Sequence, residues 1–192
     1  PHSEANIIAL QGMDVAQGES LMFATEPGEG NEVWWHWEFE GGTPATSEEQ
    51  FPMVTYEEPG TYSISLTIDN GTCEQTTLLE QAVTVYPPIS ASFTADIDTL
   101  CAGYEVHFEG TGEGVTAYNW MFVGGTPESS TEQNPTVTYN TPGTYNVVLI
   151  ATNPVDTTIV VMENYIEVVP RVRTELIMLP EDEFATVGDT VT

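Results

Sequence analysis

The sequence carries one pattern twice, at a constant distance along the chain. Residues 37–44 read Trp-Glu-Phe-Glu-Gly-Gly-Thr-Pro, and residues 120–127 repeat the tryptophan, the phenylalanine and the Gly-Gly-Thr-Pro end 83 positions later. The offset then holds without a gap from residue 37 to residue 85, and 21 of these 49 positions are identical in the second copy. Repetition at a constant period is typical of a chain built from copies of one structural unit. Both copies must therefore adopt the same fold.

The boundaries of the copies follow from prolines. Tyr86-Pro87-Pro88 separates them, and two successive prolines favour an extended, semi-rigid spacer, so we expect the copies to lie end to end. After Pro170 the pattern begins again, because residues 187–192 resemble residues 17–22. We predict one module at residues 1–86, a second at 87–170 and the first strands of a third, truncated module at 171–192.

The pattern of side chains indicates an all-β fold. Glycine and proline interrupt short runs of β-branched and aromatic residues, and no window of about 11 residues has a helical period. Trp35, Trp37 and Phe39 alternate with polar residues, which predicts that these aromatic side chains point into a core. A second inward row begins at Tyr62, after a Pro-Gly corner. A buried tryptophan facing such a tyrosine strand predicts an immunoglobulin-like β-sandwich of seven short strands, with both Trp and Tyr buried in each copy.

The same residues resemble a known family. The order Trp-x-Phe-x-Gly-Gly-Thr-Pro, then Pro-x-Val-Thr-Tyr, then Pro-Gly-Thr-Tyr is similar to the polycystic kidney disease (PKD) repeat domain, in the variant common in large surface proteins of gliding bacteria. The resemblance covers nearly the whole chain. The chain departs from the family's Trp-Asp-Phe-Gly-Asp-Gly core, because Glu38 replaces the first aspartate and the second copy has Met121 and Val123. Functions that need those aspartates are not carried over, whereas the fold is.

The resemblance also implies a role and a location. Such arrays belong to long secreted or cell-surface proteins, where they act as a stalk, filament or adhesin without catalysing a reaction. Their partners would be neighbouring PKD repeats of the same chain and a surface polysaccharide or protein. The alternative is an accessory array of an exported multidomain hydrolase, in which PKD modules separate a catalytic domain from a polysaccharide-binding domain.

The charge of the chain excludes several partners. Lys and Arg total 2 against 30 Asp and Glu, for a formal net charge of -28. A polyanion cannot neutralise phosphates, so we expect no nucleic acid partner and no attraction to an anionic membrane. Apolar runs such as residues 158–162 are far shorter than the roughly 20 residues of a membrane helix, which predicts no membrane insertion in this segment.

Catalysis is not indicated. The three histidines stand in unrelated contexts, and residues 1–170 contain no Lys or Arg that could stabilise an oxyanion. Ser, His and Asp occur without a Gly-x-Ser-x-Gly or another nucleophile signal. We therefore predict a protein that is not an enzyme and that requires no cofactor.

Calcium is the cofactor that this composition leaves open. Sandwich arrays often bind Ca²⁺ where the loops of one module meet those of the next, since calcium prefers clustered oxygens. In this topology the junction would gather Glu57 and Glu58 from the first module with Glu113 and Asp156 from the second. Against such a site, the acids are 23 Glu and 7 Asp, and no Asp-x-Asp-x-Asp loop occurs. The alternative interpretation is that these loops are simply solvated.

Two further features are candidate contact residues. Trp34 and His36 lie on the strand face opposite to Trp35 and Trp37, and the second copy has Ala117 and Asn119 there. An exposed tryptophan beside a histidine suggests a carbohydrate or protein contact. The alternative is that a neighbouring strand or module covers it.

The remaining motifs concern modification and cysteine chemistry. Thr99 and Thr190 each follow an aspartate and precede an aliphatic residue, which resembles the acceptor for O-glycosylation in exported proteins of gliding bacteria. Cys73 is expected at the N-terminal pole of the first module and Cys101 at the opposite pole of the second. A disulfide between them would exceed the Cα separation limit of about 7 Å, so we expect both to be unpaired within the chain.

Overall fold

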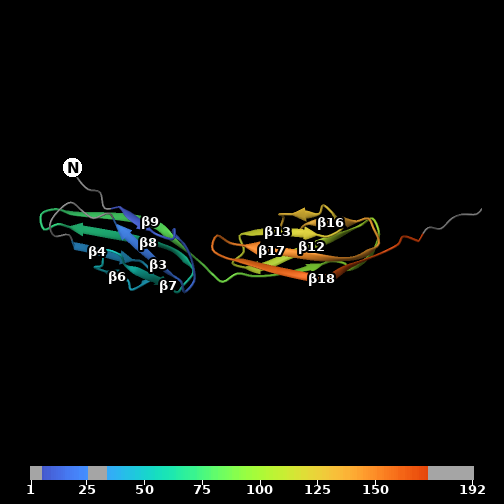
Figure 1. Ribbon diagram of the computed structural model, residues 1–192, viewed down its shortest axis with the longest axis horizontal. Coiled ribbons are helices and arrows are strands. Elements are labelled where there is room, and N and C mark those ends of the chain that lie inside the picture. Colours follow the sequence, from blue (N-terminus) through green and yellow to red (C-terminus); the bar gives the residue numbers. More distant parts are fainter. Residues whose placement is uncertain (1–5, 26–33, 173–192) are drawn as a thin grey trace, which may run out of the picture.

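The computed structural model describes residues 6–25 and 34–172, which form two β-sandwiches that lie end to end (Figure 1). Within these ranges the ordered elements are all strands, which confirms the all-β, immunoglobulin-like fold class. Among the same residues, no helix is long and apolar enough to span a membrane. The segment after Tyr86 connects the sandwiches, as Figure 1 shows between β9 and the second sandwich.

The first sandwich has nine strands in two sheets. The four-stranded sheet has the order β1-β3-β7-β5 and the five-stranded sheet the order β2-β9-β8-β4-β6. The strands are β1 Ile7–Ala9, β2 Asp14–Ala16, β3 Ser20–Thr25, β4 Trp34–Phe39, β5 Gly42–Thr43, β6 Thr46–Ser47, β7 Met53–Tyr56, β8 Gly60–Asp69 and β9 Glu74–Tyr86.

The second sandwich repeats this plan. Its sheets have the orders β10-β12-β16-β14 and β11-β18-β17-β13-β15. The strands are β10 Ser90–Ala95, β11 Thr99–Cys101, β12 Tyr104–Glu113, β13 Ala117–Phe122, β14 Gly125–Thr126, β15 Ser129–Ser130, β16 Thr136–Tyr139, β17 Gly143–Thr152 and β18 Thr157–Val169. Even the register is conserved, since Trp37 lies opposite Leu66 and Trp120 opposite Leu149.

The expected number of seven strands is wrong for the described residues, which form nine in each repeat. The N-terminal strand divides into two pieces on opposite sheets: β1 pairs with β3 antiparallel, whereas β2 pairs with β9 in parallel. The two-residue strands β5, within the Gly-Gly-Thr-Pro segment, and β6, just after it, account for the rest of the difference. Alternation over four or more residues cannot reveal strands this short.

The predicted tryptophan cores are confirmed in both repeats. Trp37 is 0% and Trp120 1% exposed, and each ring stacks on the phenylalanine two residues later, with centroids 5.6 Å and 5.5 Å apart. Each indole N–H donates to a backbone carbonyl, to Glu49 O at 2.9 Å and to Glu132 O at 2.8 Å. The largest side chain of each core is therefore both buried and hydrogen-bonded.

The expected burial of Tyr62 and Tyr145 is only partly correct. Both are half-buried, because each hydroxyl donates to a carbonyl at the preceding corner, 2.8 Å away, and therefore stays at the rim. Their rings stack on Tyr56 and Tyr139, which are the fully buried tyrosines. The pKa of Tyr56 and of Tyr139 is raised to about 12. Burial of the hydroxyl is the larger cause, and the neighbouring tyrosine is the smaller one.

Candidate functional site

The outer face of β4 carries the strongest candidate contact residues. Because side chains alternate along the strand, Trp37 and Phe39 face the core while Trp34 and His36 face outward. Trp34 is 55% exposed, and the His36 side chain is 52% exposed. The structure therefore places both residues on the surface, as the sequence predicts.

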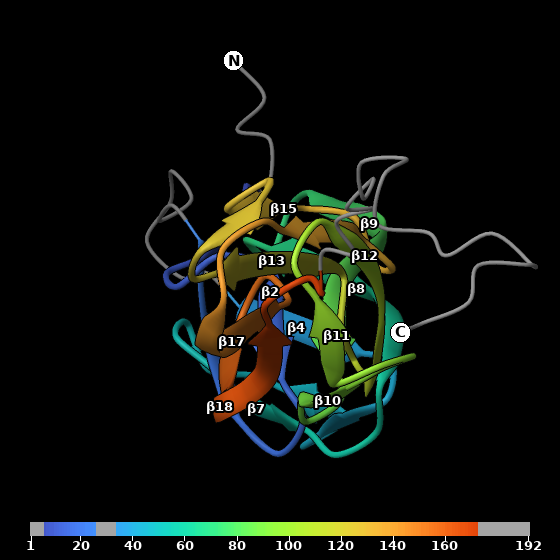
Figure 2. The same cartoon turned by 90° about the vertical axis from the view of Figure 1, so that its right-hand side faces the viewer.

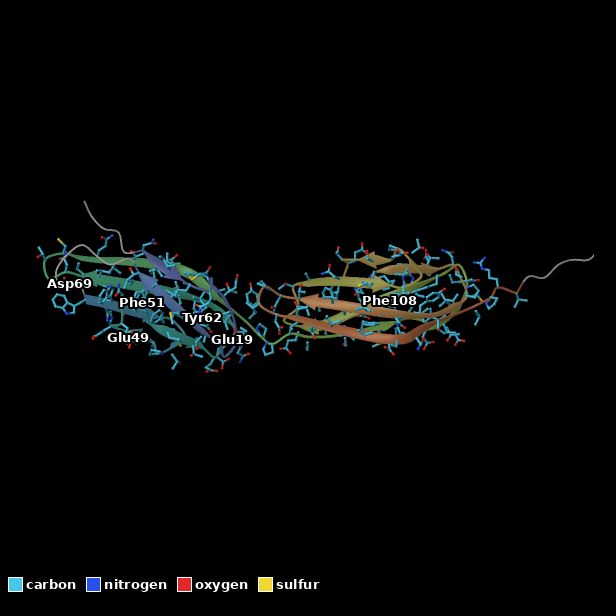
Figure 3. All side chains as sticks on the ribbon, viewed as in Figure 1. Glu19, Glu49, Phe51, Tyr62, Asp69 and Phe108 are labelled. Carbon is cyan, nitrogen blue, oxygen red and sulfur yellow. The ribbon has the colours of Figure 1, made fainter. Side chains whose placement is uncertain are left out.

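Neighbouring strands turn this face into a groove. Its volume is about 550 Å³, and its lining residues are Trp34, Trp35, His36, Glu48, Thr67, Asp69 and Glu74. Asp69 on β8 lies opposite Trp34, and Glu74 on β9 lies opposite Asp69, so two carboxylates continue the row that the indole begins. Figure 3 shows Asp69 at the end of the first sandwich that points away from the second.

Local contacts hold the groove in shape. The Asp69 Oδ1 atom accepts the Gly71 N–H at 2.7 Å, and a methyl group at Gly71 would lie 3.6 Å from the Trp34 ring. On the same face, the hydroxyls of Thr67 and Thr76 are 2.8 Å apart. The Trp35 indole N–H is buried and has no hydrogen-bond partner within the described part of the chain.

The groove joins an aromatic surface to hydrogen-bond acceptors. A flat exposed indole binds the C–H face of a sugar or an apolar side chain, and nearby carboxylates accept hydrogen bonds from hydroxyl groups. His36 Nε2 lies 3.9 Å from Glu38 Oε1, so the histidine already has an acidic neighbour. Sequence reasoning identified Trp34 and His36 but missed Glu48, Asp69 and Glu74. The pairing of β4 with β8 and of β8 with β9 would have located Asp69 and Glu74, whereas Glu48 lies after β6.

The four residues expected to bind calcium lie at three separate places in the fold. Glu57 and Glu58 follow β7, where their carbonyls accept hydrogen bonds from Gln17 and Tyr62, each at 2.8 Å. Glu113 ends β12, and Asp156 lies in the turn before β18. Within residues 6–25 and 34–172, no three or more His, Cys, Asp or Glu side chains form a group that could hold a metal ion. The calcium site stays a prediction.

One of the two candidate glycosylation residues is described. Thr99 begins β11, is exposed, and donates its hydroxyl hydrogen to Asp98 Oδ1 at 3.2 Å. Thr190 lies outside the described residues. Modification at both threonines stays a prediction.

Comparison with known proteins decides the family. The model of the PKD domain matches residues 8–83 and 90–159, which together make up more than half of the chain. The chain belongs to the PKD domain family. The two matches fall on the two sandwiches, so the chain holds two PKD domains in tandem, which are typically non-catalytic modules. The resemblance drawn from the tryptophan and Pro-Gly-Thr-Tyr motifs is confirmed at this level.

Solved structures with tandem sandwiches are similar to these PKD domains. The N-terminal four Ig domains of Dscam1 are 13% identical, with 89% of this chain and 47% of that one covered and a TM-score of 0.41. The fibronectin(III)-like modules of Clostridium thermocellum CbhA are 9% identical, with 91% of this chain and 100% of that one covered and a TM-score of 0.45. A variant of three titin Ig domains is 10% identical, with 88% of this chain and 67% of that one covered and a TM-score of 0.49. The chain spans about half the length of the Dscam1 structure. No curated protein matches the sequence.

Proposed function

We propose that the chain is a non-catalytic structural and interaction array of a secreted or cell-surface protein, acting as a stalk, filament or adhesin. The observation that carries this proposal is the end-to-end placement of two PKD domains joined through Pro87 and Pro88 (Figure 1). A rod of stiffly joined modules projects a binding surface away from its point of attachment. The large surface proteins of gliding bacteria would be the setting for such an array.

The proposed contact surface of the array is the groove beside Trp34, and the proposed ligand is a surface polysaccharide. Trp34 offers a flat apolar face, while Glu48, Asp69 and Glu74 offer acceptors for the hydroxyls of a sugar. The net charge of -28 favours a neutral or basic glycan over an acidic one. A basic protein segment is the competing ligand and is an outcome of the test below.

Replacing Trp34 is expected to weaken this binding. Loss of one stacked aromatic contact costs roughly 1.4 kcal/mol or more, so Trp34→Ala should weaken the affinity for a neutral oligosaccharide by about tenfold or more. The affinity is measured by calorimetry with gluco-, manno- and chito-oligosaccharides, and a lysine-rich peptide serves as the competing probe. The change in tryptophan fluorescence on adding ligand gives a second readout, which Trp34→Ala should reduce, because Trp34 is 55% exposed whereas Trp37 and Trp120 are buried.

The matched control is Met121→Ala. Met121 is 52% exposed on β13 of the second domain, and its replacement should leave the affinity unchanged. If Trp34→Ala and the unmodified chain bind the oligosaccharide with equal affinity, the groove beside Trp34 is not the binding surface. Binding of the lysine-rich peptide alone would replace the glycan with a basic protein partner.

A further inference from the structure

The outer face of the five-stranded sheet in the second sandwich is apolar at its centre. Side chains alternate along β13, β17 and β18, so every second residue points away from the core. Met121 lies opposite Val148, and Val148 lies opposite Val161, so these three side chains form a row across the strands. Ile150 and Ile159 lie opposite each other in the next row. We call these five residues the apolar face.

The apolar face is open to solvent along the side of the molecule. Met121 is 52%, Ile159 60% and Val161 53% exposed, while Val148 and Ile150 are half-buried. In Figure 1 the strands run along the long axis, so their side chains point sideways rather than toward either end. Figure 2, which looks along that axis, shows β17 and β18 at one side of the second sandwich and β10 and β12 at the other. A contiguous apolar patch on a surface marks a site of contact.

The equivalent face of the first sandwich is polar. The places of the first row, 83 residues earlier, belong to Glu38, Ser65 and Leu78. Those of the second row belong to Thr67 and Thr76. The Ser65 hydroxyl donates to Glu38 Oε2 at 3.0 Å, and the two threonine hydroxyls are 2.8 Å apart. Because both domains share one fold and register, the fold itself does not require apolar residues at these positions.

The apolar face also lacks charge, in a chain whose net charge is -28. Strands β13 and β17 and residues 157–162 of β18 contain no Asp, Glu, Lys, Arg or His. On the equivalent face, the first domain has the carboxylates of Glu38, Asp69 and Glu74, and the second domain has Met, Thr and Thr at the corresponding positions. Repulsion between carboxylates opposes contact between two copies of so acidic a chain, and it is weakest where this face meets another uncharged one.

We propose that the apolar face pairs with the same face of a second copy of the chain and joins two rods side by side. Twisted sheets pack face to face about 10 Å apart, with their strands within about 30° of each other. A second copy offers the same twist, the same apolar side chains and no carboxylate, whereas a basic partner would select the acidic surfaces of the chain instead. A patch that meets itself forms a two-fold contact, which closes as a dimer.

The inference goes beyond the proposed function. The apolar face lies on the second domain and shares no residue with the groove beside Trp34, which lies on the first. The pairing can therefore fail while the glycan contact holds, and the glycan contact can fail while the pairing holds.

The size of the apolar face sets the strength of the pairing. Three strands about 4.8 Å apart, each contributing six residues of about 3.3 Å, give a plane of roughly 300 Å². Two such planes in contact fall below the total of about 1,200 Å² at which stable interfaces begin. The pair is therefore weak, with a Kd on the order of 0.1 mM for the free chain. Chains attached close together on one surface would pair more completely, because their local concentration is higher.

Sedimentation equilibrium of the whole 192-residue chain, from about 10 µM to about 0.5 mM, measures the pairing. Between about 0.1 M and about 1 M NaCl the Debye length falls from about 10 Å to about 3 Å. Because salt screens the repulsion between two polyanions, the dimer should become tighter by about threefold or more. A chain that stays monomeric throughout would overturn the proposal, also if it binds phosphatidylcholine vesicles through this face. A dimer that weakens with salt would overturn it too, because ion pairs elsewhere would then hold the copies together.

The double variant Met121→Glu with Val148→Ser gives the second domain the pair that the first domain carries at Glu38 and Ser65. The first domain accommodates this pair with a hydrogen bond, so the variant should fold, as its melting temperature will show. Two like charges brought together across the two-fold contact should raise the Kd by about tenfold or more. An unchanged Kd in the folded variant would show that the copies pair through another surface and would overturn the proposal.

Leu78→Glu is the matched control. Leu78 is 56% exposed on β9, at the position that Val161 has in the second domain, and the substitution adds one negative charge, as the double variant does. The Kd of the dimer should stay within about twofold of that of the unmodified chain, because the first domain lies outside the contact. If Leu78→Glu weakens the dimer as much as the double variant, net charge rather than the apolar face governs the pairing, and the proposal is wrong.

Discussion

Replacing Trp120 with alanine is expected to lower the free energy of unfolding of the second domain by roughly 3 to 5 kcal/mol. The side chain is 1% exposed, stacks on Phe122 and meets Phe93 edge-on, with ring centroids 5.2 Å apart. Truncation therefore leaves a cavity between the sheets and also leaves the Glu132 carbonyl without its indole donor. Urea unfolding followed by near-UV circular dichroism measures the change.

The next residue along β13 supplies the control. Met121 points to the opposite face and is 52% exposed, so Met121→Ala should change the stability by no more than about 0.5 kcal/mol. A loss below about 1.5 kcal/mol for Trp120→Ala would mean that the tryptophan does not form the centre of the core.

The second large effect is expected at Gly124, in the Gly-Gly-Thr-Pro corner. Its φ angle is +71°, and a methyl group there would overlap the Tyr145 ring. Gly124→Ala should cost roughly 1 to 2 kcal/mol for the left-handed backbone and about 1 to 3 kcal/mol for the overlap, which would displace the ring. Gly41 and Tyr62 make the same pair in the first domain, which explains why both copies carry glycine here. Thermal and urea unfolding give the cost.

Gly12 separates the two contributions. Its φ angle is +94°, but no atom lies within 4 Å of the position that a methyl group would take. Gly12→Ala should therefore show only the backbone cost. If Gly124→Ala and Gly12→Ala destabilise the chain equally, the close packing of Tyr145 against the corner contributes nothing.

The repeat and its period predicted most of the fold from the sequence. The alternation of apolar and polar residues in β4 predicted that Trp37 lies in the core and Trp34 on the surface. The prediction succeeded because a strand of six residues is long enough to show the two-residue period. The same argument predicted a buried Tyr62, which is only half-buried. An alternating pattern shows that the side chain points inward, but it does not show that a hydrogen bond from the hydroxyl keeps the ring at the rim of the core. It also failed for β5 and β6, which are too short to have a period.

Sites between elements were predicted less well than the fold. Trp34 was recognised because an aromatic residue on a polar face is conspicuous in a single strand. Asp69 and Glu74 join it only through the pairing of β4 with β8 and β9, which a pass along one strand does not reveal.

Small-angle X-ray scattering of the 192-residue chain tests the central claim, that the two PKD domains form a stiff end-to-end rod. A compact globule of this length has a radius of gyration of about 16 Å. The account predicts a clearly larger radius and an asymmetric pair-distance distribution with a long tail, as expected for two sandwiches in line. A radius near the compact value with a symmetric distribution would show that the domains fold back on each other, and would contradict the account.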